Sequence, residues 1–214
     1  MPDLGRAAKA LSRAAISAAK AQGAGGSYIT TRFSYSDGLA GFVADYLNGG
    51  NARSTLNAAK RMVVEKLWEA GQRGFRDGAE DASAELSSED SRYLVQRQND
   101  ELDFIDNLWD DLAERRKQDP VTFPQDRIDQ YTNSLDDVYN ALKLRGAANI
   151  TLEFFGNDGI QSCSTCARLQ GKRHPAKWWI ENDMIPGAAN PNYKCGGFRC
   201  QHALRTPSGK RFTL

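Results

Sequence analysis

Four cysteines, all in the C-terminal quarter of this 214-residue chain, are the residues whose type and spacing most clearly indicate chemistry. Two of them form the pair Cys163-Ser-Thr-Cys166, and Cys195 and Cys200 follow after a loop rich in Pro, Asn and Gly. Thiolate is a soft ligand, and Zn²⁺ takes four such ligands at the corners of a tetrahedron. The spacing therefore predicts a structural zinc site made by Cys163, Cys166, Cys195 and Cys200.

The residues around the second pair bear on how this site would close. Gly196 and Gly197 supply the freedom in φ that folding the backbone between Cys195 and Cys200 requires. His202 follows two residues after Cys200, so it is either an alternative metal ligand or a residue that orients one of the ligands.

Three other interpretations of the cysteines stay open: two disulfides, unliganded thiols in a core, and a redox pair. Nothing at the N-terminus resembles a secretion signal, so we expect a reducing compartment, which disfavours disulfides. A redox Cys-x-x-Cys is expected within a βαβ pattern, which the surrounding sequence does not show. A bound metal is the favoured interpretation.

The composition allows one domain with a sizeable core plus a small appendage. The hydrophobic fraction is 40% and the charged fraction 26%. No apolar run approaches the ~20 residues that a membrane-spanning helix needs. The net charge of +1 hides an asymmetry, because residues 80–114 hold twelve acids against two arginines, whereas residues 163–214 hold nine bases against two acids. Each half is expected to solvate itself or to attract the other, and the basic half can also attract an acidic partner.

The N-terminal segments carry weaker signals. Residues 4–22 predict a basic helix with an alanine-rich face, which a run of glycines ends. Residues 27–35 have the composition of a strand or an extended linker. Ser36 or Asp37 can then cap a short helix that ends near Leu47.

Three longer helices follow, each with apolar residues three and four positions apart. The first begins near Asn51, the second at Ser87 or Ser88, and Gly146 ends the third. Asn149–Phe155 then has strand composition. We therefore expect a mainly α protein, an elongated helical bundle followed by a small α+β, Cys-rich lobe that zinc staples. The expected domains are a basic helix with its glycine linker (1–26), a helical domain (27–148) and a Cys-rich C-terminal domain (149–214).

Two features predict how the long helices pack. Gly71, Gly74 and Gly78 would let another helix approach closely. Trp109 lies on the apolar face of the second long helix, where the change to alanine is expected to cost on the order of 3 kcal/mol. The acidic residues of that helix fall mainly on its other face and are expected to be solvated.

Five features follow one another near the C-terminus: an acidic turn, a Cys-x-x-Cys pair, a Leu-x-Gly-Lys motif, a Pro-rich loop and a closing cysteine pair. In this chain they are Asn157–Gly159, Cys163–Cys166, Leu169–Lys172, Ile185–Tyr193 and Cys195–Cys200. Their order resembles the C-terminal domain of tailed-phage minor head proteins, the head-morphogenesis family named after the F protein of phage Mu. Many members close with His-Pro-x-Cys-x-Cys, whereas four residues separate the closing cysteines here. The resemblance covers roughly residues 150–206.

This resemblance implies a low-copy structural protein of the virion head, made in the cytoplasm of the host bacterium. Such a protein would lie in the capsid interior near the portal and take part in head assembly and in DNA packaging or delivery. The helices would then meet the portal protein or other capsid or scaffold proteins. The basic lobe would face packaged DNA or another capsid component.

The basic C-terminal segment supports an alternative hypothesis, a zinc-stapled nucleic-acid-binding module that acts as a regulator. The candidate contacts are its cations, with ring-bearing residues beside them. The cations are Lys172, Arg173, Lys194, Arg199, Lys210 and Arg211, and the rings are those of His174, Trp178, Trp179 and Phe198.

We do not expect catalysis. His174 and His202 are the only histidines, and neither lies in a His-Glu-x-x-His or a deaminase motif. No glycine loop has the Lys-Ser/Thr that binding a phosphate requires. Four cysteines on one ion would also leave no open position for a reactive water.

Overall fold

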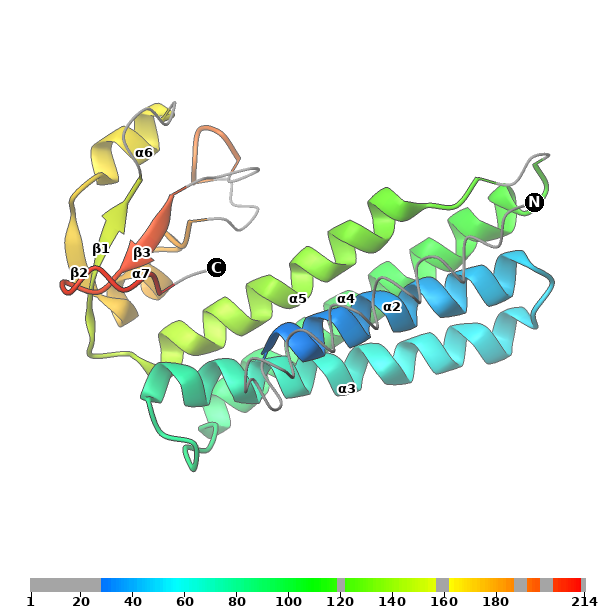
Figure 1. The fold of residues 1–214 in the computed structure, drawn as a ribbon, viewed down its shortest axis with the longest axis horizontal. Coiled ribbons are helices and arrows are strands. Elements are labelled where there is room, and N and C mark those ends of the chain that lie inside the picture. The colour runs from blue at the N-terminus through cyan, green and yellow to red at the C-terminus, as the bar shows by residue number, and fades with distance from the viewer. Residues whose placement is uncertain (1–27, 119–121, 157–161, 187–191, 197–201, 213–214) are drawn as a thin grey trace. The chain divides into compact units, whose positions relative to one another are not determined.

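The computed structural model describes residues 28–118, 122–156, 162–186, 192–196 and 202–212. Within these ranges the chain forms six helices and one sheet of three strands (Figure 1). The predicted fold class, mainly α with a small α+β lobe that contains the cysteines, is confirmed. The predicted helix over 4–22 and the linker after it lie outside the described residues.

The chain divides into two compact units, and the long helices contribute to both of them. The first, which we call the helical unit, comprises Met1–Ala70 and Ser91–Asp136. The second, which we call the C-terminal unit, comprises Gly71–Asp90 and Asp137–Leu214.

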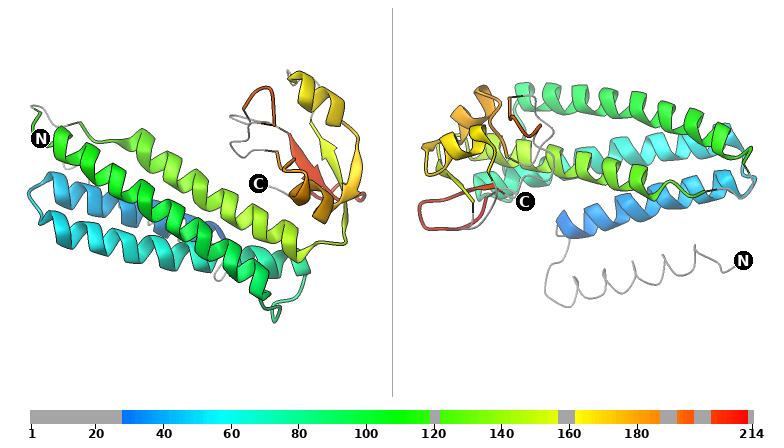
Figure 2. Two further views of the ribbon diagram at one scale, coloured as in Figure 1. Left: turned by 180° about the vertical axis from the view of Figure 1, so that it is seen from behind. Right: turned by 90° about the horizontal axis from the view of Figure 1, so that it is seen from above.

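Four helices lie side by side in the helical unit (Figure 2). They are α2 (Tyr28–Leu47) and the parts of α3 (Ala52–Ala79), α4 (Ser88–Arg115) and α5 (Gln125–Gly146) that belong to this unit. Their apolar stripes meet in a core in which Leu39, Val63, Ile105 and Leu135 are fully buried. Trp109 is only 5% exposed, so its predicted place on the apolar face of α4 is confirmed.

The N-terminal part of α2 differs from the sequence prediction. Residues 28–35 are helical rather than extended, and Ser36 and Asp37 lie inside the helix instead of capping it. The buried residues of α2 keep a three-and-four spacing from its first turn onward: Tyr28, Thr31, Tyr35, Leu39, Val43 and Tyr46. Burial of this stripe outweighs the strand preference of Tyr, Ile and Thr, because helix propensities differ by less than about 1 kcal/mol per residue.

Glycines bring α3 and α5 together within the C-terminal unit. A Cβ atom at Gly74 would lie 2.3 Å from the carbonyl oxygen of Tyr139, and one at Gly78 would lie 1.9 Å from that of Lys143. No side chain fits at such distances, so the helix backbones touch only because these positions are glycine. The close approach predicted at Gly74 and Gly78 is thus confirmed.

A three-stranded antiparallel sheet with the order β2-β1-β3 forms the centre of what we call the sheet lobe. Its strands are β1 (Thr151–Phe155), β2 (Arg173–Pro175) and β3 (Ala203–Arg205), and its short helices are α6 (Ser164–Leu169) and α7 (Ala176–Glu181). The strand predicted at Asn149–Phe155 is therefore confirmed as β1. The buried core contains Leu144, Ala147, Leu152, Phe154, Cys166, Leu169, Ala176, Trp179, Tyr193, Leu204 and Phe212.

In the part of the chain that the structure describes, every helix is too short or too polar to cross a membrane.

Candidate metal centre

The first cysteine pair lies where α6 begins. Cys163 is the N-cap residue of α6, and its sulfur accepts a hydrogen bond from the backbone N–H of Cys166 at 3.5 Å. Because the first helical turn brings these two residues to the same side, their Sγ atoms lie 3.5 Å apart. A disulfide bond would need about 2.05 Å, so this pair is a dithiol.

The segment after α6 anchors the pair to the sheet. Gly171, at φ +75°, donates its N–H to the carbonyl of Phe154, whose own N–H donates to the carbonyl of Lys172. The Leu-x-Gly-Lys motif therefore forms the turn that leads from α6 into β2. Cys166 is buried in the lobe core, whereas Cys163 is half-buried.

Cys195 comes from a separate turn and reaches the same place. Tyr193 holds this turn, since its side chain is 2% exposed and stacks on Phe154 with ring centroids 6.4 Å apart. The N–H of Lys194 donates to Thr165 Oγ1 of α6 at 3.2 Å. Gly196, at φ +69°, follows directly, so the predicted need for glycine is confirmed at Gly196, while Gly197 lies outside the described residues.

Three sulfur atoms therefore gather at one end of the sheet lobe. The Sγ atoms of Cys163, Cys166 and Cys195 all lie within 4.8 Å of one another. In a tetrahedron with Zn–S bonds of about 2.3 Å, neighbouring sulfurs are about 3.8 Å apart. The observed spacing fits three ligands of one metal ion, so these three cysteines could hold a metal.

The thiol of Cys163 has a lowered pKa. The N–H of Cys166 is the main cause and burial opposes it, while the Cys166 thiol and then the backbone N–H and the thiol of Cys195 add to the lowering. Together they lower the pKa of Cys163 from 9.0 to about 6. Thiolate is the form that binds metal, so this sulfur is prepared for coordination near neutral pH.

Of the other two predicted ligands, Cys200 lies outside the described residues, and His202 lies beside the cysteines rather than among them. The Nε2 atom of His202 is 2.9 Å from the hydroxyl of Ser162, the residue before Cys163. Its ring stacks on Phe154 with centroids 5.2 Å apart, and burial lowers its pKa. A Cβ at Gly156 would lie 2.6 Å from this ring, so glycine there makes room for it.

Most of the cations proposed to contact nucleic acid are exposed in the described residues. Lys172, Lys194, Lys210 and Arg211 are exposed, but the Nζ of Lys210 lies 3.6 Å from Glu80. Arg199 lies outside the described residues.

Arg173 has a structural partner that the sequence analysis missed. Its guanidinium binds one carboxylate oxygen of Glu153 at 2.9 Å, while Arg205 binds the other at 2.7 Å. The sequence does show Glu153 as an acidic residue inside a predicted strand, which indicates a buried ion pair. Its partners could not be identified from the sequence, because they follow 20 and 52 residues later. These ion pairs join β2 and β3 to the central strand β1.

The aromatic residues of the lobe are mostly occupied by packing. Trp179 is fully buried and donates its indole N–H to the carbonyl of His174 at 3.2 Å. Trp178 is half-buried and stacks on the His174 ring with centroids 3.8 Å apart. A base has no access to the faces of Trp179, and Phe198 lies outside the described residues.

In comparisons with known proteins, no family model, no curated protein and no solved structure matches this chain.

Proposed function

We propose that this chain is a structural minor head protein of a tailed bacteriophage, without enzymatic activity, and that Zn²⁺ staples its C-terminal lobe. One observation carries the metal part of the proposal: three sulfurs from two separate turns lie within 4.8 Å of one another. A site in which four protein ligands surround zinc has no place for a reactive water, which suits a structural role.

In this proposal Cys200 is the fourth ligand. It shares the chemistry of the other three and follows Cys195 by five residues. The hydrogen bond between His202 and Ser162 favours a role in supporting the Cys163 turn, with direct ligation by His202 as the alternative.

The assignment to the phage head depends on the order of motifs in the C-terminal segment. In the structure, the Cys-x-x-Cys pair lies beside Cys195, and the Leu-x-Gly-Lys turn joins the pair to the sheet of the same lobe. The acidic turn, most of the Pro-rich loop and Cys200 lie outside the described residues. The proposed partners are the portal protein, other capsid or scaffold proteins and packaged DNA.

Zinc analysis tests the metal part of the proposal. Freshly purified, reduced protein should contain one zinc per chain, with its thiols protected from titration until a chelator is added. Cys200→Ser should lower zinc affinity strongly, whereas His202→Gln should retain one zinc per chain. Folded protein without zinc, or loss of zinc from His202→Gln alone, would contradict the proposed ligand set.

Proteomics of purified phage particles tests the role in the head. The protein should be found at a few copies per particle and should remain with the heads after the tails are removed. Its absence from particles would rule out a virion role, even if zinc is bound.

The alternative function, a nucleic-acid-binding regulator, is favoured only by the exposure of its predicted cations, Lys172, Lys194, Lys210 and Arg211. The burial of Trp179 and the pairing of Arg173 with Glu153 argue against it. Binding to a short DNA duplex that weakens steeply with added salt would support this function. No binding at low salt would exclude it.

A further inference from the structure

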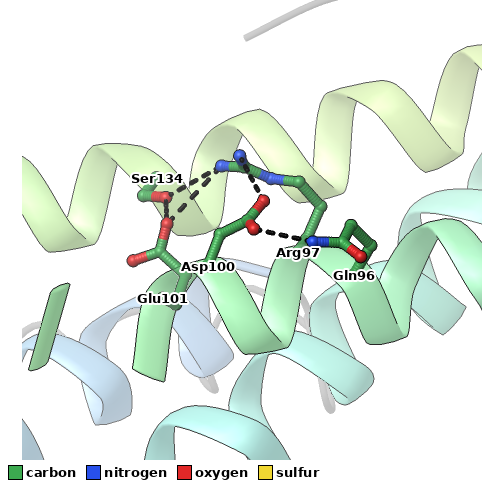
Figure 3. A network of polar contacts seen from close by, with 5 residues as sticks. All are labelled: Gln96, Arg97, Asp100, Glu101 and Ser134. Atoms are coloured by element: carbon green, nitrogen blue, oxygen red, sulfur yellow. Dashed lines mark hydrogen bonds and ion pairs between the residues drawn. The ribbon is translucent and has the colours of Figure 1, made fainter. Parts of the chain in front are cut away.

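The interior of the helical unit contains a carboxyl group, that of Glu101 on α4. Its side chain is only 1% exposed. Figure 3 shows two groups that point at one of its oxygens, the hydroxyl of Ser134 on α5 and the guanidinium of Arg97 one turn earlier on α4. Ser134 donates a short hydrogen bond to Oε1, and Nη2 of Arg97 lies 3.5 Å from the same atom.

The other carboxylate oxygen of Glu101, Oε2, has no such hydrogen-bond donor. Oε2 of Glu101 is buried and has no hydrogen-bond partner among the described residues. Tyr35 on α2 is also fully buried, and its hydroxyl has no hydrogen-bond partner among the described residues either. Burial and the negative charge of Glu101 both raise the pKa of Tyr35, so the two groups are within electrostatic reach of each other.

Arg97 compensates the charge of Glu101 only in part. Its side chain is 28% exposed, and it also approaches Asp100 at 3.6 Å. The Asp100 charge acts on Glu101 in the opposite direction from Arg97.

The charges that act on the pKa of Glu101 come from its own helix, from Arg97 and Asp100. From α5, Tyr131 lies near enough for the Glu101 charge to affect its pKa, but its hydroxyl donates to the Phe104 carbonyl at 2.7 Å. Between α3 and α4, the Gln98 amide donates to the Val64 carbonyl, and five residues beyond Glu101 the Lys60 ammonium pairs with Asp106 at 2.6 Å. A carboxylate in this position is therefore buried with incomplete compensation, which is costly.

We propose that Glu101 is a proton-binding site that makes the helical unit sensitive to pH. On mild acidification the carboxyl takes up a proton, which removes the buried charge. The new O–H can donate a hydrogen bond, which a buried carboxylate cannot. The Tyr35 hydroxyl on α2 also has no hydrogen-bond partner among the described residues, and the two groups are not hydrogen-bonded to each other in the structure. The inference uses only residues of the helical unit, so it does not depend on the proposed zinc site or on the phage assignment.

The direction in which pH changes the stability of the helical unit follows from the pKa of Glu101. Burial raises its pKa above the ordinary 4.5, and the hydrogen bond from Ser134 and the charge of Arg97 reduce this rise. Between the unfolded and folded pKa values, the folded chain binds more protons than the unfolded chain. The stabilisation from this group is complete below the unfolded value and is lost as pH rises through the folded value.

A carbon-13 NMR titration of the Glu101 side chain in the full chain tests the proposal directly. The Cδ resonance, identified by its absence in Glu101→Gln, should move with a midpoint above 4.5. A midpoint at or below this value would overturn the proposal. Assignment through the backbone makes the measurement possible even if the variant does not fold.

Denaturant unfolding of Glu101→Gln from about pH 4 to about pH 8 provides a second test. The variant should match the unchanged protein at the acidic end and become more stable than it as pH rises. The control is Glu114→Gln on the same helix, where the side chain is 72% exposed, and its difference from the unchanged protein should not grow with pH. A difference at position 101 that stays constant or reverses its sign would contradict the proposal.

Discussion

Glu101 in the helical unit and Glu153 in the sheet lobe are the same residue type, and both side chains are largely hidden from solvent, at 1% and 11% exposed. Their carboxyl groups nevertheless respond in opposite directions. Hydrogen bonds from Arg205 and then Arg173 lower the pKa of Glu153, whereas burial raises that of Glu101. The placement of guanidinium groups decides whether the pKa of each carboxyl group is raised or lowered, because burial alone always favours the neutral form of an acid.

The two regions also rely on different interactions for their stability. The helical unit has a long apolar core, and such a core can tolerate one poorly compensated carboxylate. The sheet lobe has strands of only three to five residues and a smaller core, and it adds two arginine pairs and a cysteine cluster. We therefore expect changes to polar and sulfur groups to destabilise the lobe, and changes to apolar groups to affect both regions.

The largest effect is expected from Cys163→Ser. Structural zinc contributes roughly 10 kcal/mol or more to the folding of zinc-finger peptides, so with zinc bound as proposed the lobe should lose both its metal and its folded structure. Indole NMR signals of Trp178 and Trp179 should change, while that of Trp109 in the helical unit should remain. Ser164→Ala, at an exposed neighbouring position, is the control. A metal-free Cys163→Ser protein with unchanged melting temperature would show that the lobe needs no staple.

Removing one large indole from each region should have the next largest effect. Trp179 is fully buried and Trp109 is 5% exposed, so each change to alanine should cost about 3–5 kcal/mol through the cavity it leaves. Trp179→Ala should also speed zinc loss to a chelator, because Trp179 stacks on Phe154 in the core that contains Cys166. Trp109→Ala should leave zinc retention unchanged. Equal zinc loss in both variants would mean that the two regions are not independent.

Glu153→Gln should destabilise the lobe by about 1–2 kcal/mol, since it leaves two arginines without a charged partner. The cost is moderate because the Arg173 and Arg205 side chains are 59% and 32% exposed. The stabilisation from Glu153 is present above pH 4.5 and is lost as pH falls through its lowered folded pKa. The variant and the unchanged protein should therefore converge in stability in acid, as expected for Glu101→Gln. The two variants differ at neutral pH, where Glu153→Gln should be less stable than the unchanged protein and Glu101→Gln more stable. Urea unfolding at several pH values measures how the stability of each variant, relative to the unchanged protein, depends on pH.

The smallest effect is expected from Arg97→Gln, with a stability change below about 1 kcal/mol because the pair is loose and partly exposed. The Arg97 charge lowers the pKa of Glu101, so the NMR midpoint of Glu101 should move further upward in this variant. Lys117→Gln, which removes the exposed partner of Glu114, should leave that midpoint in place. A downward movement in Arg97→Gln would show that Arg97 does not act on Glu101 as a counter-charge.

Glu101 also shows what the sequence analysis overlooked. The acidic residues of α4 were expected on its solvated face, yet Glu101 follows Leu94 by seven residues and precedes Ile105 by four and Leu108 by seven. This spacing places it in the apolar stripe. Its charge had been counted with the surrounding acids, although its position in the stripe predicted burial.

The extended conformation expected for residues 27–35 was wrong for a related reason. Local composition favoured a strand, whereas Tyr28, Thr31 and Tyr35 continue the helical spacing of Leu39 and form the buried side of α2. Propensity is a weak local preference, and burial against neighbouring helices exceeds it.

The sequence by itself determined the features that depend on neighbours along the chain. The period of the long helices, the strand at β1, the glycines at close contacts and the cysteine pair at one helical turn all follow from short-range backbone geometry. The cysteine types also led to the expectation that Cys195 meets the pair about 30 residues earlier, as the structure has it. Only the tertiary structure decided that two arginines enclose Glu153 and that one oxygen of Glu101 has no hydrogen-bond partner among the described residues. These contacts depend on which faces pack together and on the charges that packing brings near, and spacing along the chain does not encode either of them.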